Sequence, residues 1–416
     1  MSYEETKDSP RPEGPVHARP SRRARRKARA AKRTRGWRWG RRALLSLGIV
    51  VVLLAGLAGG TWWYINYRLD QTHRITGLGP VLHQHAKPGK PFDIALVGSD
   101  SRAFELKSGS SAFGSYSSYP GQRSDVVIIA RVIPATKQVY MLSIPRDTMV
   151  NIPGHVKYIS GENRINAAFN EGPKLLIQTI EQNFGIPIEH FAAINFQGFR
   201  DMVNAIGGIK IDFPYQLKDA YSQLHIDHTG CQLIKGNEAL AYVRSRHLYY
   251  LKNGHWIYDG LSDWSRIRRQ DVFFHALIET VKSEALNLPA MNDLLIAVVH
   301  NLSVDSFFSN SALLNLVLEF RHAGVGSLHS EVLPTIPYVT PSGQDVLLQA
   351  KGPDRAMIKA FLAEGTTPAK KKTTPSSTSS TPSSTSPTTT TTTTTPSNNS
   401  NVFFDTQPEP WNGTPC

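Results

Sequence analysis

The sequence contains five short motifs in which arginine stands beside acidic or small polar residues. They are Gly-Ser-Asp-Ser-Arg at 98–102, Arg-Ser-Asp at 123–125, Ser-Ile-Pro-Arg-Asp at 143–147, Tyr-Val-Arg-Ser-Arg at 242–246 and Arg-Ile-Arg-Arg-Gln at 266–270. Several adjoin apolar runs typical of buried strands, where a guanidinium group is costly unless an anion pairs with it. The motifs together predict a site for a multiply charged anion, and a pyrophosphate with a metal ion would fit.

The planar fork of arginine matches two oxygens of a phosphate, so the arginines are the first candidates for this site. Those next to strand-like or helix-start segments are Arg123, Arg146, Arg244, Arg246 and Arg266. A structural ion pair explains any single one equally well, but it is a poor explanation of all five. Arg244 and Arg246 would share one face if their segment is extended. Arg268 and Arg269 are more ambiguous, because helix surfaces commonly carry arginine.

Two aspartates are candidate metal ligands. Asp100 follows an apolar run and a glycine, which places it where ligands meet the strand ends of an open α/β sheet. The alternative for Asp100 is a turn-forming residue. Asp125 directly precedes another strand-like run. Two such carboxylates from neighbouring strands would suit Mg²⁺, which prefers a few carboxylates together with phosphate oxygens.

Other familiar chemistries lack their motifs. The sequence has no P-loop, no Gly-x-Ser-x-Gly elbow and no His-Glu-x-x-His helix. The histidines between 222 and 255 fit no metal template, and we interpret them as surface or loop residues. Cys231 and Cys416 are the two cysteines, and the sequence leaves open whether they pair.

The formal charge of +13 is concentrated at the N-terminus. Residues 1–42 contain fifteen Lys/Arg and four Asp/Glu, which is +11, so the other 374 residues carry 13 − 11 = +2. Residues 43–65 are uncharged and, at roughly 34 Å as a helix, long enough to span a bilayer. A cleaved signal peptide is the alternative to a retained membrane anchor. For a retained anchor, the positive-inside rule predicts a disordered cytoplasmic arm at 1–42, a single-pass helix in the cell membrane and an extracytoplasmic remainder.

Composition divides the remainder into three parts. Residues 66–90 are expected to form a membrane-proximal linker, and residues 91–363 have a globular composition. Residues 364–416, with eight consecutive threonines at 388–395, are expected to be a disordered tail. Neither the arm nor the globular part shows a nucleic-acid-binding pattern, so we expect no nucleic-acid partner.

Strands and helices alternate within the globular part. Strands are predicted at 92–97, 126–132, 139–143, 191–194 and 209–213, and helices at 173–184, 196–206 and 266–283. Residues 238–243 resemble a helix or a strand. The alternation predicts an α/β fold, a three-layer α-β-α sandwich with a central mixed sheet that follows the transmembrane helix.

The order of these motifs resembles the LytR-CpsA-Psr family, in an actinobacterial form, over roughly residues 91–285. Besides the arginine motifs, it rests on Ile-Asn-Ala-Ala-Phe at 165–169, Phe-x-Gly-Phe at 196–199 and Gly-Gly-Ile at 207–209. The resemblance implies an extracytoplasmic, Mg²⁺-dependent phosphotransferase that moves a glycopolymer from a polyprenyl-pyrophosphate carrier to peptidoglycan. It also implies that apolar helices bury the isoprenoid tail against the sheet.

The resemblance also assigns roles to residues. Asp100 and Asp125 match metal-binding positions, and Arg146, Asp147 and Arg266 match catalytic positions. The pyrophosphate-binding positions match Arg123, Arg146, Arg244, Arg246, Arg266 and Gln270. Either Asp147 or a metal-site aspartate would serve as the base.

Two segments, 103–122 and 247–265, are longer than the family pattern leads us to expect, and we interpret them as loops beside the site. The alternative function is a membrane sensor or transcriptional attenuator that binds polyprenyl phosphates without turnover. A wall-anchoring protein is a third hypothesis, favoured by the Thr/Pro-rich tail alone.

Overall fold

The computed structural model describes residues 47–83, 89–99, 124–155, 163–320, 325–366 and 410–416. The chain forms two compact units, Met1–Asn66 and Tyr67–Cys416. The described part of the first unit belongs to a helix, Leu47–Leu69, that is long and apolar enough to cross a membrane. This helix overlaps most of the predicted span 43–65 and continues four residues beyond it, while residues 43–46 lie outside the described part.

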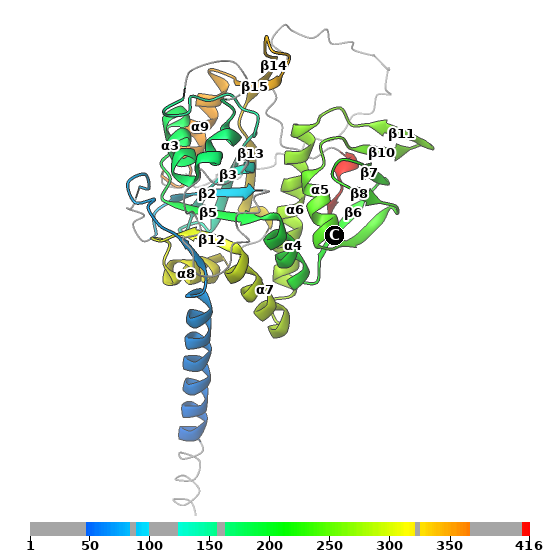
Figure 1. Ribbon diagram of the computed structural model, residues 1–416. Coiled ribbons are helices and arrows are strands. Elements are labelled where there is room, and N and C mark those ends of the chain that lie inside the picture. The colour runs from blue at the N-terminus through cyan, green and yellow to red at the C-terminus, as the bar shows by residue number, and fades with distance from the viewer. Residues whose placement is uncertain (1–46, 84–88, 100–123, 156–162, 321–324, 367–409) are drawn as a thin grey trace, which may run out of the picture. The chain divides into compact units, whose positions relative to one another are not determined.

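A seven-stranded mixed sheet forms the centre of the second unit (Figure 1). In spatial order its strands are β1 (His73–Ile75), β12 (Leu302–Asp305), β5 (His190–Asn195), β2 (Phe92–Ser99), β3 (Ser124–Ile133), β4 (Gln138–Ile144) and β13 (Leu328–Val332). β2, β3 and β4 are antiparallel neighbours, whereas β2–β5, β1–β12 and β4–β13 are parallel pairs. The predicted central mixed sheet is confirmed.

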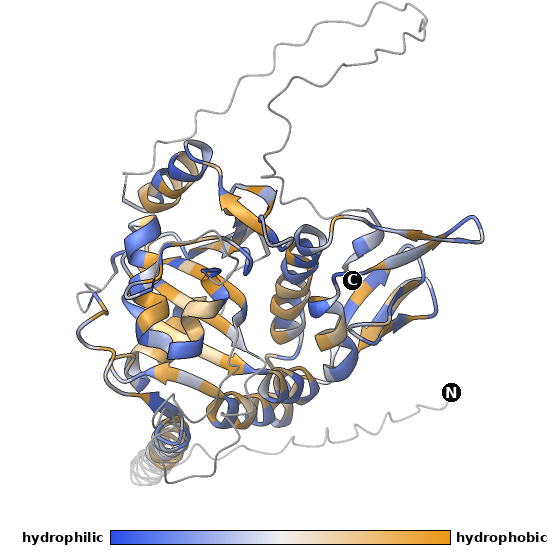
Figure 2. Cartoon of the chain, turned by 45° about the horizontal axis from the view of Figure 1, so that its top comes forward, coloured by the Kyte–Doolittle hydropathy of each residue, from blue (hydrophilic) through white to orange (hydrophobic). Residues whose placement is uncertain are grey.

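Alternation along the strands divides the side chains between two helical layers. On one face Ala95 and Ile129 pack against α2 (Ile165–Ala168), α3 (Pro173–Phe184) and α9 (Pro353–Ala363). On the other face Ile94 and Ala130 pack against α8 (Asn310–Phe320). The apolar sides of strands and helices therefore meet in two layers of core (Figure 2).

A second core lies beside the sheet. It contains α4 (Phe196–Ala205), α5 (Gly236–Arg244), α6 (Asp263–Ser283), α7 (Leu288–Asn301), β6 (Ile209–Phe213) and β9 (Gly230–Ile234). β6 lies between β9 and β16 (Thr414–Pro415). The remaining strands form a four-stranded sheet in the order β11 (His255–Tyr258), β10 (Tyr249–Lys252), β7 (Leu217–Asp219), β8 (Leu224–Ile226), and a hairpin of β14 (Thr335–Val339) and β15 (Asp345–Gln349).

Two predictions about the organisation of the chain are corrected. Residues 66–83 do not form a separate linker, because β1 joins the sheet and Ile75 and Leu82 belong to the core. Residues 238–243, which the sequence left open between a helix and a strand, are helical within α5, so Arg244 and Arg246 do not share the face of an extended strand. The second correction concerns the tail.

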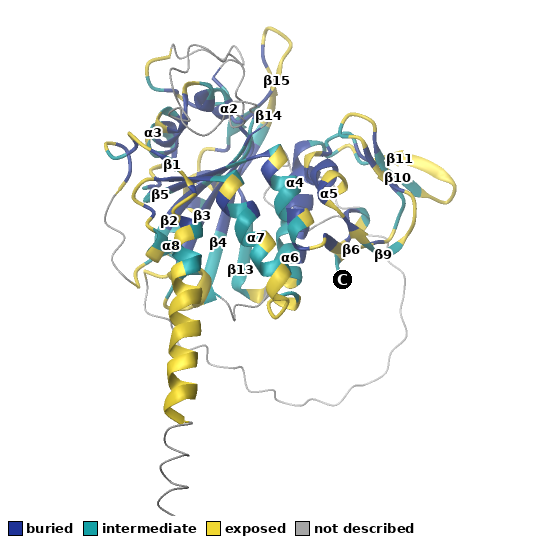
Figure 3. Cartoon of the chain, turned by 60° about the horizontal axis from the view of Figure 1, so that its bottom comes forward, coloured by how far each residue is buried: buried dark blue, intermediate teal, exposed yellow. Residues whose placement is uncertain are grey.

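The last seven residues, predicted as part of a disordered tail, fold back onto the second core. β16 pairs with β6, and Cys416 forms a disulfide with Cys231 on β9. Trp411, in the short helix η5 (Pro410–Asn412), stacks on Tyr250 with 4.6 Å between ring centroids. Figure 3 shows the C-terminus beside β6 and β9. The tail prediction therefore fails for 410–416.

Candidate active site

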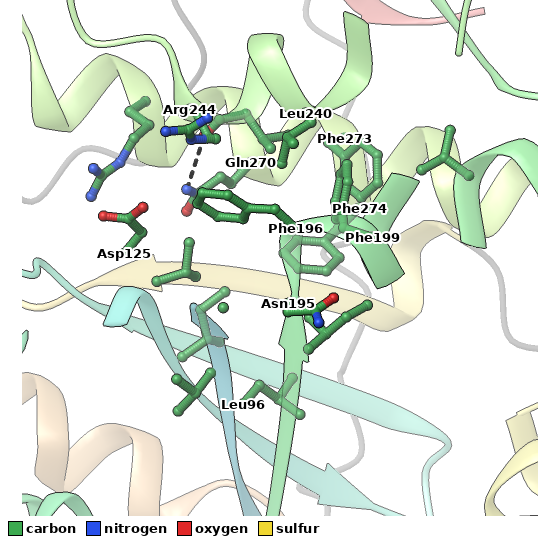
Figure 4. A pocket seen from close by; sticks show the side chains of 18 of the residues that line it. Leu96, Asp125, Asn195, Phe196, Phe199, Leu240, Arg244, Gln270, Phe273 and Phe274 are labelled. Atoms are coloured by element: carbon green, nitrogen blue, oxygen red, sulfur yellow. Dashed lines mark hydrogen bonds between the residues drawn. The ribbon is translucent and has the colours of Figure 1, made fainter. Parts of the chain in front are cut away.

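A cavity of about 450 Å³ lies between the central sheet and the helices of the second core. Leu96 and Ile128 form its floor, because they occupy the sheet face opposite the α3 layer. Phe199, Phe273 and Phe274 line its helical side (Figure 4). Most of the lining is apolar, as is usual for sites that bind apolar ligands.

One end of the cavity is charged. Asp125, Arg146, Arg246, Arg266 and Gln270 all line it there. Asp125 and Arg146 come together because the start of β3 lies antiparallel to the end of β4. Arg246 follows the C-terminus of α5, and Arg266 lies in the first turn of α6.

These residues, with two further aspartates, form an alternating network of carboxylate and guanidinium groups. Arg146 Nη1 lies 2.5 Å from Asp125 Oδ1, and its Nε lies 3.5 Å from Asp147 Oδ2. Arg246 links Asp147, at 3.2 Å, to Asp263, at 3.0 Å. Arg266 Nη2 completes the network 3.0 Å from Asp263 Oδ1. The arrangement holds three arginines side by side at the mouth without leaving their charge uncompensated.

The environment affects the pKa values of two of these arginines in opposite directions. Burial acts to lower the pKa of Arg146, but Asp147, Asp125 and Asp263 outweigh it and hold the pKa above its ordinary value. Burial lowers the pKa of Arg266, and the attraction of Asp263 offsets only part of that effect, since Arg246 and Arg146 repel it. Because guanidinium groups titrate far above neutral pH, both remain cations.

Arg266 has capacity for an additional anion. Its side chain is 5% exposed, and its Nε is buried without a hydrogen bond in the described part of the chain. A buried donor without a partner costs about 1–3 kcal/mol. An anion in the cavity that accepted from this N–H would remove that cost.

Arg244 and Gln270 lie beside the network. The Arg244 guanidinium lies 4.2 Å from the centroid of the Phe196 ring, so a cation–π contact holds it at the cavity wall. Gln270 Nε2 donates to the carbonyl of Val243 at 3.1 Å, which ties α6 to α5 beside Arg244 (Figure 4). The structure thus brings together four of the five predicted arginines and Gln270.

Asp147 contacts three arginines at once. Its carboxylate accepts from Arg164 at 3.3 Å and from Arg246 at 3.2 Å, and it also lies near Arg146. It is absent from the lining of the cavity, whereas Asp125 is part of it. The geometry therefore gives Asp147 the role of positioning arginines.

Sequence reasoning missed several residues that build the site. Asp263 stands three residues before Arg266 on one helix face, a spacing from which the pair could have been predicted. Asp219 has no such signal, yet its Oδ2 accepts from Ser245 Oγ at 2.7 Å and from the N–H of Arg246 at 3.0 Å. Burial acts to raise the pKa of Asp219, but these and other backbone hydrogen bonds hold it below its ordinary value.

Arg269, which from the sequence could equally be a surface residue, is fully buried. Its Nη1 donates to Ser265 Oγ at 2.7 Å and to Asn412 Oδ1 at 2.9 Å, and it pairs with Asp259 at 3.3 Å. It also donates to the carbonyl of Ser245. Arg269 therefore joins α6, the segment before Arg246 and the C-terminal segment behind the site.

Two predicted site residues, Asp100 and Arg123, lie outside the described part of the chain. Among the described residues, no group of three or more His, Cys, Asp or Glu side chains could hold a metal ion by itself. Mg²⁺ commonly takes one or two carboxylates and completes its shell with water and phosphate oxygens. The cavity-lining carboxylate of Asp125 fits one such position.

Comparison with known proteins gives a consistent result. The LytR_cpsA_psr family model matches residues 66–346. The chain is 29% identical over 284 residues to the polyisoprenyl-teichoic acid–peptidoglycan teichoic acid transferase TagU of Enterococcus faecalis, an alignment that covers 66% of this chain and 82% of TagU. It is 36% identical over 189 residues to the probable cell wall biosynthesis protein LcpB of Corynebacterium glutamicum, covering 45% of this chain and only 41% of LcpB.

Among solved structures, the LytR-Csp2A-Psr enzyme from Actinomyces oris is similar with a TM-score of 0.53 and 22% sequence identity. The match covers 70% of this chain and 95% of that one. At this identity the likeness establishes the fold.

Proposed function

The chain belongs to the LytR_cpsA_psr family, and we propose that it is a membrane-anchored phosphotransferase that transfers a glycopolymer from a polyprenyl-pyrophosphate carrier to peptidoglycan. The observation that carries this proposal is a cavity with an apolar interior and a mouth lined by Arg146, Arg246 and Arg266. A hydrocarbon tail joined to a pyrophosphate has the same division between apolar and charged parts. TagU, a relative at 29% identity that is named as a teichoic acid transferase, supports the same reaction class.

The residues of this chain account for two requirements of such a transfer. The apolar lining would bind the polyprenyl tail by burial, and the arginines would hold the two phosphates in one orientation. The acceptor hydroxyl attacks the glycan-linked phosphorus and gives its proton to a carboxylate base, for which Asp147 and the metal-site aspartates are the candidates. A new P–O bond forms, and the bond to the polyprenyl phosphate breaks. Negative charge grows on that leaving phosphate, and preorganised guanidinium groups stabilise it.

The role of Mg²⁺ is part of the proposal. Asp125 would supply one carboxylate ligand, and Asp100 is the second predicted ligand. When bound, the ion would neutralise part of the charge on the pyrophosphate. The Arg146–Asp125 contact places the candidate metal ligand directly beside an arginine of the phosphate site.

The proposed location also has two supports. The helix Leu47–Leu69 can cross a membrane, and the basic N-terminal arm favours a cytoplasmic N-terminus. The Cys231–Cys416 disulfide is of the kind that persists in an oxidising compartment, which supports an extracytoplasmic location of the second unit.

A transfer assay tests the proposal. The full chain, in detergent, would receive a short-chain polyprenyl-pyrophosphate disaccharide and a peptidoglycan fragment, with Mg²⁺ or with EDTA. We expect Mg²⁺-dependent phosphodiester product, and we expect Arg146→Ala to reduce transfer by more than about tenfold. Arg355→Ala, an exposed arginine on α9, is the matched control and should be unaffected.

The transferase and the alternative function, a membrane sensor that binds polyprenyl phosphates without turnover, give opposite results in this assay. Tight binding of the lipid donor without product, over a panel of donors, would support the sensor and refute the transferase. Full turnover by a folded Arg146→Ala protein would remove Arg146 from the proposed phosphate site.

A further inference from the structure

The β10–β11 hairpin is rooted in the charged mouth of the cavity. Arg246 precedes it and Asp263 follows it, and their ion pair of 3.0 Å joins its two ends. Asp219 Oδ2 also accepts from the N–H of His247 at 2.9 Å, and the N–H of Asp259 donates to Leu248 at 3.0 Å. The residues that shape the mouth therefore also set the direction of the hairpin.

One face of this hairpin carries aromatic side chains outward. Tyr249 lies opposite Tyr258, and Leu251 lies opposite Trp256, so these four side chains share a face. The intervening Tyr250 points the other way and stacks on the C-terminal segment. Outward faces of antiparallel sheets are usually polar, which makes an aromatic one informative.

The three rings of this aromatic face are exposed and close together. Tyr249, Trp256 and Tyr258 are 39%, 40% and 45% exposed, and β11 is yellow in Figure 3. The centroids of the Tyr249 and Tyr258 rings lie 5.2 Å apart. Lys218, opposite Tyr249 on β7, places its ammonium group 4.0 Å from the centroid of the Trp256 ring.

The aromatic face lies close to cavity-lining residues, because Tyr258 is within electrostatic range of Asp219 and Arg246. Tyr221 and His247 line the mouth, with ring centroids 4.3 Å apart, and Tyr221 is 81% exposed. His247 stands two residues before Tyr249 in the chain. A ligand that reaches the arginines can therefore lie along the hairpin at the same time.

We propose that this aromatic face binds the glycan strand of the peptidoglycan acceptor, an inference that rests on the proposed transferase function. A pyranose ring presents a face of C–H groups, whose positive hydrogens are attracted to the negative face of an aromatic ring. The tyrosine hydroxyls can meanwhile bond to sugar hydroxyls. Neighbouring exposed rings suit a run of sugars better than a single small molecule.

Two features favour the acceptor over the donor. The tail and pyrophosphate of the donor would already occupy the cavity and its arginines, while the acceptor strand has no lipid to anchor it. The attacking hydroxyl must also approach in line, opposite the leaving polyprenyl phosphate. It therefore enters from the charged mouth, where the hairpin is rooted.

Sedimentation with insoluble peptidoglycan, stripped of covalently bound polymers, tests the inference without turnover. We expect the full chain to bind, and Trp256→Ala/Tyr258→Ala to weaken binding by about tenfold or more. Ile257→Ala is the matched control, because Ile257 is 38% exposed and lies between the two rings on the opposite face. In the transfer assay the double variant should raise the KM for the acceptor and leave the KM for the donor unchanged.

Other outcomes would overturn the inference separately from the proposed function. Normal transfer, with unchanged glycan binding and acceptor KM in the double variant, would refute the aromatic face and leave the transferase standing. The double variant could instead keep its binding to glycan strands and lose binding to lipid-free donor polymer or to zwitterionic lipid vesicles. That result would assign the face to the other ligand. Glycan binding that depends on the rings, without any transfer, would support the face and refute the transferase.

Discussion

Removal of the C-terminal disulfide is expected to cost a large part of the stability of the second unit. Cys231 and Cys416 are separated by 185 residues, and closing so long a loop restricts the unfolded chain. The chain-entropy relation gives a stabilisation of about 5 kcal/mol for a loop of this size. Cys416→Ser should therefore lower the urea midpoint strongly, and a reductant should lower that of the wild type by a similar amount.

The same change should reach the active site through Asn412. Its side-chain oxygen accepts from Arg269 at 2.9 Å and from Ser265 at 3.2 Å, and its carbonyl accepts from the Tyr242 hydroxyl at 2.5 Å. Arg269 lies on α6, the helix that also carries Arg266. If the segment detaches, the buried guanidinium of Arg269 loses Asn412 as a hydrogen-bond partner. We expect transfer to fall together with stability.

A double-mutant cycle separates the covalent link from the docked segment. Asn412→Ala should cost about 1–3 kcal/mol in the oxidised wild type, because it leaves buried donors unsatisfied. In the Cys416→Ser protein the same substitution should cost much less, since the segment is already released. This reasoning would be refuted if the oxidised wild type, the reduced wild type and Cys416→Ser all had the same urea midpoint.

Two further predictions concern acid stability and the donor. The lowered pKa of Asp219 gives stability that is present above its unfolded pKa of about 3.9 and is lost as pH falls through the folded pKa. Asp219→Asn should thus be about 1–3 kcal/mol less stable than the wild type in urea at pH 7, with a smaller difference at pH 3, and an equal difference at both would count against it. Phe274→Glu places a carboxylate in the apolar cavity, so it should raise the KM for the donor by more than about tenfold. The binding of free pyrophosphate should not change. An unchanged KM for the donor would show that the lipid binds elsewhere.

The regular elements were largely predictable from the sequence. Helix 173–184 was predicted at its observed bounds, because its apolar spacing and Gly185, with φ of 66°, mark a helix and its end. The strand pair 126–132 and 139–143 was predicted almost to the residue. Alternation and branched side chains specify such local structure strongly.

Long-range pairing was not predictable. β1 is three residues long and joins the sheet through β12, about 230 residues later, so no local pattern reveals it. Arg269 sits beside Arg268 with no sequence signal, yet two of its partners, Ser245 and Asn412, come from distant segments. The motif of Asp147 marks it as a candidate site residue, but only the fold shows that its carboxylate contacts Arg146, Arg164 and Arg246.

The folded C-terminal segment changes what the Thr/Pro-rich stretch can do. With 353–363 packed on one face of the sheet and 410–416 bonded to the second core, residues 367–409 are fastened at both ends. A single protease cut between residues 366 and 410 would therefore release no fragment while the disulfide is intact. The nicked protein would run as one species on a non-reducing gel and as two after reduction.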